Sequence, residues 1–107
     1  MDVHKELGHG LLEIVYKDAI EYELQMRKIP FKREKEYEIR YKDIVLPHRF
    51  YADFVVYDSV IVEIKAQKNI VDENLKQIIN YLALSKNKVG LIINFGEPSL
   101  KFKRVVF

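Results

Sequence analysis

The chain has 107 residues, of which 49% are hydrophobic and 32% charged, a composition that fits one folded domain and excludes a disordered chain. Cysteine is absent, which excludes disulfides and thiolate metal sites, and no apolar run approaches the roughly 20 residues that a membrane-spanning helix needs. The net charge of only +2 does not by itself indicate nucleic-acid binding, and the charged first residues do not form a secretion signal, so we expect a cytoplasmic protein.

The first part of the chain predicts two helices separated by glycines. Val3 and Leu7 have helical spacing, but Gly8-His9-Gly10 favours non-helical backbone and predicts a break. Apolar residues then recur every three or four positions from residue 11 to about 28, which predicts a longer helix. Pro30 helps to end that helix.

The middle of the chain predicts antiparallel strands. Alternating apolar and charged residues over 31–41 indicate an edge or near-edge strand with one wet face. A turn at Lys42-Asp43 leads into a short strand over 44–46, which Pro47 stops or bends because it lacks a backbone donor. The strand that follows begins near Phe50.

Two apolar runs meet at Asp58-Ser59 and predict a hairpin of central strands. Asp53, Glu63 and Lys65 interrupt these runs, and charges placed there need a compensating partner. Glu63 and Lys65 share one face because side chains alternate along a strand. A two-residue loop would turn Asp53 to the other face, whereas a three-residue loop over 57–59 or a bulge would place it opposite Glu63. We expect a three-residue loop or a bulge.

Two carboxylates and a lysine on one face form an oxygen-rich site that suits Mg²⁺ or Mn²⁺, with the lysine beside a bound water. The alternative is a surface cluster or a set of paired charges, because a lone aspartate and a Glu-x-Lys segment are common in a charged chain.

The last third predicts a helix over 71–86, followed by strands over 88–95 and 100–107. Gln77 and Tyr81 are four residues apart and share a face of that helix. The order strand, helix, strand indicates a parallel crossover, so the fold class is α/β with a mixed sheet.

Several ordered motifs together resemble a known family. Asp53 followed ten positions later by Glu63-Ile64-Lys65 resembles the core signature of the PD-(D/E)XK nuclease superfamily. Gly10-Leu-Leu-Glu13-Ile-Val-Tyr16 resembles the motif that names the GxxExxY proteins, a small branch of that superfamily. Three more segments stand where that branch has comparable ones, and the resemblance extends from Val3 to Val106: Tyr41-Lys42, Gln77-Ile-Ile-Asn-Tyr81-Leu82 and Gly90-Leu-Ile-Ile-Asn94-Phe95-Gly96.

The resemblance implies a restriction-endonuclease-like core, in which two main helices flank a central mixed sheet, and a Mg²⁺- or Mn²⁺-dependent nuclease activity. The implied metal ligands are Asp53, Glu63 and the carbonyl of Ile64, and Glu13 would support a second ion or a ligand water. Glu13 also falls in the first turn of its helix, where a carboxylate interacts favourably with the helix dipole, so its role can be purely structural.

The resemblance also implies roles for three residues beyond the ligands. Lys65 would position or deprotonate the attacking water, while Gln77 and Tyr81 would brace the site. The alternative for Gln77 and Tyr81 is a buried polar pair that fixes the position of the helix. The chain departs from the family pattern at Asn74, where a histidine is expected three residues before the glutamine. It also keeps only a short front helix over 2–7, and apolar surface left open there would favour a homo-oligomer.

The expected partner is nucleic acid, DNA more than RNA. Two groups of basic residues are candidates for phosphate contacts, although such groups are often solvated faces. They are Lys28, Lys32, Arg33 and Lys35, and Lys101, Lys103 and Arg104. The alternative function is a catalytically inactive nuclease-fold module that binds nucleic acid or a protein.

Overall fold

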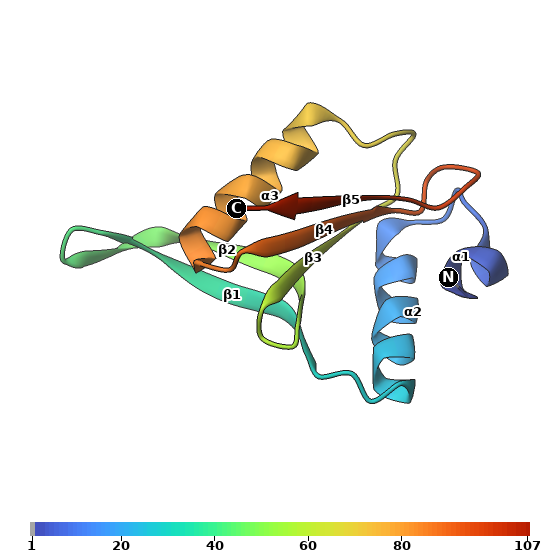
Figure 1. Cartoon of the computed structure of the whole chain (residues 1–107), viewed down its shortest axis with the longest axis horizontal. Coiled ribbons are helices and arrows are strands. Elements are labelled where there is room, and N and C mark those ends of the chain that lie inside the picture. Colours follow the sequence, from blue (N-terminus) through green and yellow to red (C-terminus); the bar gives the residue numbers. More distant parts are fainter. Residues whose placement is uncertain (1) are drawn as a thin grey trace.

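The computed structural model describes residues 2–107 as an α/β domain with one five-stranded sheet and three helices (Figure 1). In chain order the elements are α1 (Asp2–Leu7), α2 (Glu13–Met26), β1 (Phe31–Tyr41), β2 (Ile44–Val56), β3 (Val60–Lys65), α3 (Asp72–Ser85), β4 (Val89–Asn94) and β5 (Lys101–Val106). The strand order in the sheet is β1-β2-β3-β4-β5. Only β3 and β4 are parallel, and α3 connects them, so the expected crossover and mixed sheet are confirmed.

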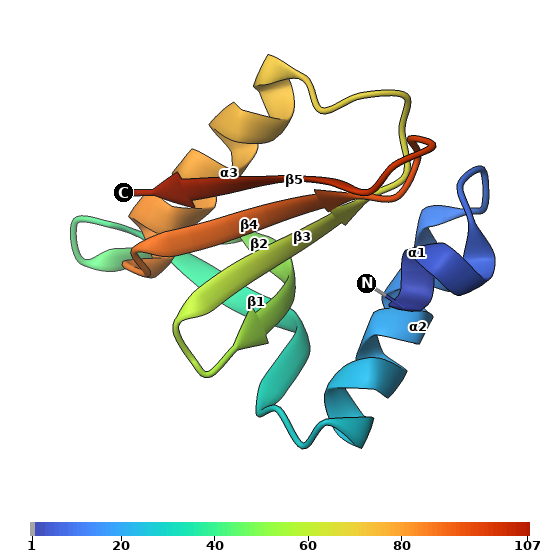
Figure 2. The same cartoon turned by 45° about the vertical axis from the view of Figure 1, so that its right-hand side comes forward.

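The two long helices lie on opposite faces of the sheet (Figures 1 and 2). One core forms between α1, α2 and the sheet from Val3, Tyr16, Ile20, Phe54, Val62, Ile64 and Phe95. The other forms between α3 and the sheet from Ala52, Val55, Ile61, Ile78, Leu82 and Ile92. Because both faces are covered, β3 is buried almost throughout, as its apolar sequence predicts.

Helix α2 begins two residues later than predicted because the segment before it is held in another conformation. Gly8 and Gly10 have positive φ angles of 70° and 97°. The fully buried Tyr16 hydroxyl donates to the Gly8 carbonyl at 2.7 Å and accepts from the Leu11 N–H at 3.2 Å. These contacts give Tyr16 a structural role, and its ring also stacks on Phe95 at 4.7 Å between centroids.

The β1–β2 hairpin is longer than predicted, since β2 continues through Pro47. Pro47 therefore does not end the strand, but the pairing register of β1 and β2 shifts between Glu38 and Arg40, opposite the part of β2 that contains Pro47. In Figure 1 the end of this hairpin projects beyond the rest of the sheet. β1 is an edge strand, as its alternating sequence predicts.

The same hairpin changes the face on which its side chains lie. Phe54 packs in the core beneath α2, whereas Ala52, two residues away, packs in the core beneath α3. On the neighbouring strand Glu34 has a positive φ of 52°, between Arg33, which pairs with Phe54, and Lys35, which pairs with Ala52. Asp53 therefore lies where the hairpin passes from one core to the other.

Within residues 2–107, none of the helices combines the length and the hydrophobicity that crossing a lipid bilayer requires.

Candidate functional site

The turn between β2 and β3 sets a pairing register in which Asp53 and Glu63 lie opposite each other on the two strands. Val56 pairs with Val60, so the loop has three residues, and the Ser59 N–H donates to the Val56 carbonyl at 3.1 Å. This confirms the expected three-residue loop. Pairing continues to Phe54 and Val62, and the next residues along the two strands are Asp53 and Glu63.

Beyond that pair, carboxylates replace the backbone ladder between β2 and β3. The Asp53 N–H donates to Glu63 Oε2 at 3.0 Å, and the Ile64 N–H donates to Asp53 Oδ2 at 2.7 Å. Each carboxylate thus satisfies a backbone donor that a regular antiparallel ladder would satisfy with a carbonyl. The gap between these strands is consequently lined with oxygen atoms.

The carbonyl of Ile64 faces the same gap. In an extended strand the N–H and C=O of one residue point to the same side, and those of the next residue point to the other. The Ile64 N–H is directed at Asp53 of β2, while the Lys65 carbonyl accepts from the Phe95 N–H at 2.8 Å on the β4 side. The Ile64 carbonyl therefore points to the β2 side of β3, the side on which Asp53 lies.

Glu63 has a strongly perturbed acidity. The residue is only 4% exposed. Burial, and then the negative charge of Asp53, raise the pKa of the Glu63 carboxyl from 4.5 to about 8. At neutral pH this carboxyl is mostly protonated, so the pair carries less than its full negative charge. Such a pair has the donor chemistry for a hard divalent cation, which would favour the ionised form of both groups.

Lys65, Gln77 and Tyr81 form a chain of polar contacts on the α3 side of the sheet. Lys65 Nζ donates to Gln77 Oε1 at 3.4 Å, and Gln77 Nε2 donates to the Tyr81 hydroxyl at 2.9 Å. Burial, followed by the charge of Glu63, raises the pKa of Tyr81, and its ring stacks on Phe50 at 4.5 Å between centroids. The structure thus brings Gln77 and Tyr81 to the lysine of the predicted site.

Glu13 approaches the site through another residue, Lys17. Lys17 Nζ lies 2.9 Å from Asp53 Oδ1 and 3.4 Å from Glu13 Oε2. Burial alone would lower the pKa of Lys17, but the hydrogen bond to Asp53 and the surrounding carboxylate charges outweigh that effect and raise it. Glu34 Oε1 is a third neighbour at 3.8 Å from the same ammonium.

The predicted ligands are therefore only partly assembled. Within residues 2–107, no three His, Cys, Asp or Glu side chains converge into a ready metal-binding group. Asp53 and Glu63 are in contact, the Ile64 carbonyl points to the β2 side of β3, and Glu13 is joined to Asp53 by the Lys17 ammonium.

Lys17 and Glu34 were missed by the sequence reasoning. Lys17 follows Glu13 by four residues, a spacing that predicts an ion pair on a helix face but gives no hint of a contact with Asp53. Glu34 lies in a charged strand, and nothing local distinguishes it from the other glutamates there. Asn94 was also missed as a support. This buried side chain bonds both backbone groups of Gln67, at 3.0 and 2.9 Å, and so fixes the segment after Lys65.

Two other sequence features have structural roles. Asn74, which stands at the position expected for histidine, accepts from the Val71 N–H at 2.9 Å at the start of α3. Arg33, from the first basic group, lies 2.8 Å from Asp18 and 3.3 Å from Glu21 and so joins β1 to α2.

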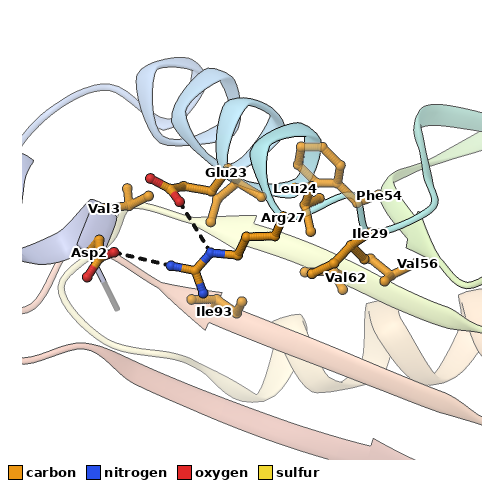
Figure 3. A pocket seen from close by; sticks show the side chains of 11 residues that line it. Asp2, Val3, Glu23, Leu24, Arg27, Ile29, Phe54, Val56, Val62 and Ile93 are labelled. Carbon is orange, nitrogen blue, oxygen red and sulfur yellow. Dashed lines mark hydrogen bonds and ion pairs between the residues drawn. The ribbon is translucent and has the colours of Figure 1, made fainter.

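A cavity of about 170 Å³ lies elsewhere, between α1, α2 and the sheet. Figure 3 shows Arg27 at this cavity, paired with Asp2 at 3.2 Å and with Glu23 at 3.4 Å, and apolar side chains form most of the wall. None of the predicted site residues lines it. The cavity is thus separate from the carboxylate pair, and the self-association expected from the short front helix stays a prediction.

The sequence model of the PD-(D/E)XK nuclease superfamily matches residues 1–105. No curated protein matches the chain in sequence. A solved structure titled "Crystal structure of SSO0001" is similar in fold, with a TM-score of 0.69 and 17% sequence identity. The match covers 86% of this chain and 49% of that one, so this chain spans about half of its length.

Proposed function

Because the chain belongs to the PD-(D/E)XK nuclease superfamily, we propose that it is a metal-dependent phosphodiesterase that acts on nucleic acid. The observation that carries this proposal is the oxygen-lined gap between β2 and β3. Asp53 and Glu63 share it, and burial together with their mutual repulsion raises the pKa of Glu63 to about 8. Such a pair at the centre of a sheet lowers the stability of the folded domain. Carboxyl groups with strongly perturbed pKa values are concentrated at functional sites.

Asp53, Glu63 and the Ile64 carbonyl are the groups that would hold Mg²⁺ or Mn²⁺. All three donors are oxygens, which these ions prefer. A bound divalent ion supplies positive charge for the developing phosphate charge and a water that is more easily deprotonated. Glu13 is the further candidate, for a second ion or a ligand water, and it would act from the α2 side.

Lys65 is the chain's own candidate for work on the attacking water and the phosphate. Its ammonium lies on the same side of β3 as Glu63, where it can donate to a water or to a phosphate oxygen. Gln77 limits the positions open to that ammonium, and Tyr81 in turn holds Gln77. These two residues brace the lysine and need not touch the reacting atoms.

The first experiment measures Mn²⁺ binding by isothermal titration calorimetry. We expect saturable binding by the wild type and its loss in Asp53→Asn combined with Glu63→Gln, since both changes keep side-chain shape. Asp43→Asn is the control, because Asp43 is an exposed carboxylate in the β1–β2 turn. A folded wild type that binds no Mn²⁺, even with an oligonucleotide present, would overturn the proposal.

Cleavage is then measured on single- and double-stranded DNA and RNA oligonucleotides with Mg²⁺ or Mn²⁺, DNA being the expected substrate. Lys65→Met should lower the cleavage rate by about 10²-fold or more, the usual contribution of a group that handles a proton, while Mn²⁺ binding persists. Binding of nucleic acid without cleavage by the metal-loaded wild type would favour the alternative, a nuclease-fold module that has lost catalysis.

A further inference from the structure

The Lys17 ammonium is enclosed by carboxylates from three elements. Glu13 comes from the preceding turn of α2, Glu34 from β1 and Asp53 from β2, at 3.4, 3.8 and 2.9 Å from Nζ. The Lys17 side chain is only 14% exposed. This lysine is therefore a partly buried cation with three carboxylate neighbours, unlike a surface lysine with one salt bridge.

Lys17 is held in that position by the packing of its helix and by the carboxylates around its ammonium. Its helix is fixed against the sheet by the fully buried Tyr16 and by Ile20. The three carboxylates would repel one another without a cation between them. Glu34 itself has a positive φ of 52° in the middle of β1, a strained conformation at the position from which its side chain reaches Lys17. The backbone conformation of β1 and the packing of α2 thus both help to hold Lys17 against the carboxylates.

The ammonium and the predicted metal position lie on different sides of Asp53. Oδ1 faces Lys17, whereas Oδ2 accepts from the Ile64 N–H in the gap that Glu63 shares. An ion held by Glu63 and the Ile64 carbonyl would therefore not need the space that Lys17 fills. The side of Asp53 nearest Glu13, where a second ion would bind, already holds a positive charge.

We propose that Lys17 is a built-in substitute for a second metal ion, so that the chain binds one divalent cation and Glu13 acts by holding Lys17. The inference rests on the proposed function, since it assigns the charge next to the same site. Lys17 is a positioning residue for Asp53: it directs Oδ1 and neutralises the carboxylates on the α2 side.

The test counts bound Mn²⁺ by electron paramagnetic resonance of the free ion, with calorimetry in parallel. We expect one ion in the wild type, one in Lys17→Arg, and two in Lys17→Met, where the carboxylates on the α2 side are left without their cation. The second ion should disappear again in Lys17→Met combined with Glu13→Gln. Lys5→Met, an exposed lysine of α1, is the matched control and should leave the count at one.

A second measurement needs no variant. Nuclear magnetic resonance of the lysine ammonium groups in the wild type should show the Lys17 signal still protected from solvent when Mg²⁺ is saturating. Two ions in the wild type, an unchanged count in a folded Lys17→Met, or release of the Lys17 ammonium by Mg²⁺ would overturn this inference and leave the nuclease proposal intact. Absence of any bound ion would overturn both.

Discussion

The buried carboxyl of Glu63 makes the stability of the protein depend on pH in an unusual direction. Its pKa is about 8 in the folded chain, against the ordinary value of 4.5. Between these values the folded state keeps a proton that the unfolded chain has released, so the free energy of unfolding falls as pH rises through this window. Most carboxylates with partners have lowered pKa values and give the opposite trend.

Replacing Glu63 by glutamine removes this titration and keeps the oxygen that accepts from the Asp53 N–H. At 1.36 kcal/mol per pKa unit, the difference between 4.5 and 8 corresponds to roughly 5 kcal/mol over the whole window. Relaxation around an ionised Glu63 reduces that value. We expect Glu63→Gln to be more stable than the wild type by about 2–5 kcal/mol at pH 9, with a difference below about 1 kcal/mol at pH 4.

The assay is urea unfolding followed by circular dichroism in the absence of divalent ions, at unit pH intervals from 4 to 9. The quantity compared is the difference between variant and wild type, in which contributions from titrating groups far from Glu63 cancel. Glu6→Gln removes a negative charge from an exposed position of α1 and serves as the control, with an expected difference within about 0.5 kcal/mol at every pH. A Glu63→Gln difference that is constant with pH, or that grows as pH falls, would refute the reasoning.

Three further predictions concern metal binding and the supports of the site. The dissociation constant for Mn²⁺ should fall about tenfold per pH unit between pH 6 and 8 and level off above, because the ion displaces the Glu63 proton; calorimetry showing no pH dependence would contradict this. Tyr16→Phe should cost about 1–3 kcal/mol in urea unfolding, since it removes two hydrogen bonds of a fully buried hydroxyl, while the exposed Tyr22→Phe should change stability by less than about 0.5 kcal/mol. Gly96→Ala should cost about 3 kcal/mol or more, because its β carbon would overlap the backbone carbonyl oxygen of Gln67; an unchanged urea midpoint would contradict this and show that the loop can shift.

Much of the fold follows from local patterns in the sequence. The alternation over 31–41 corresponds to β1, and the apolar runs around Asp58-Ser59 correspond to the hairpin of β2 and β3. Because side chains alternate along a strand, only a three-residue loop or a bulge would place Asp53 opposite Glu63, and the structure has the three-residue loop. These features depend on residues close in sequence, so the sequence alone suffices for them.

The helix face was harder to predict. The apolar residues that predict the first long helix have helical spacing, yet Ile14 is 52% exposed and Met26 is 63% exposed. The residues that α2 buries fully or nearly so are Tyr16 and Ile20. Periodicity establishes that a helix forms, whereas the surface that it buries depends on the sheet against which it packs.

The acidic surroundings of Lys17 were beyond sequence reasoning for a different reason. The contact of Lys17 with Asp53 joins residues 36 positions apart, and that with Glu34 depends on a strand residue adopting a positive φ. Neither composition nor spacing encodes a change of side-chain face within a hairpin. The residues that touch the site from a distant element are the ones that only the tertiary structure reveals.

The division of the interior into two cores has a consequence for the order in which the protein assembles. The core beneath α3 draws its buried residues from a continuous stretch between Ala52 and Ile92 and needs nothing from α1 or α2. Its contacts are closer in sequence than those of the other core, which joins Val3 to Phe95, and short loops close at a lower entropic cost. We expect the sheet and α3 to form first and α2 to dock last. Amide hydrogen exchange should therefore report a lower free energy of opening for α2 than for β3. Glu13 and Lys17 would then reach Asp53 only in the final step of folding.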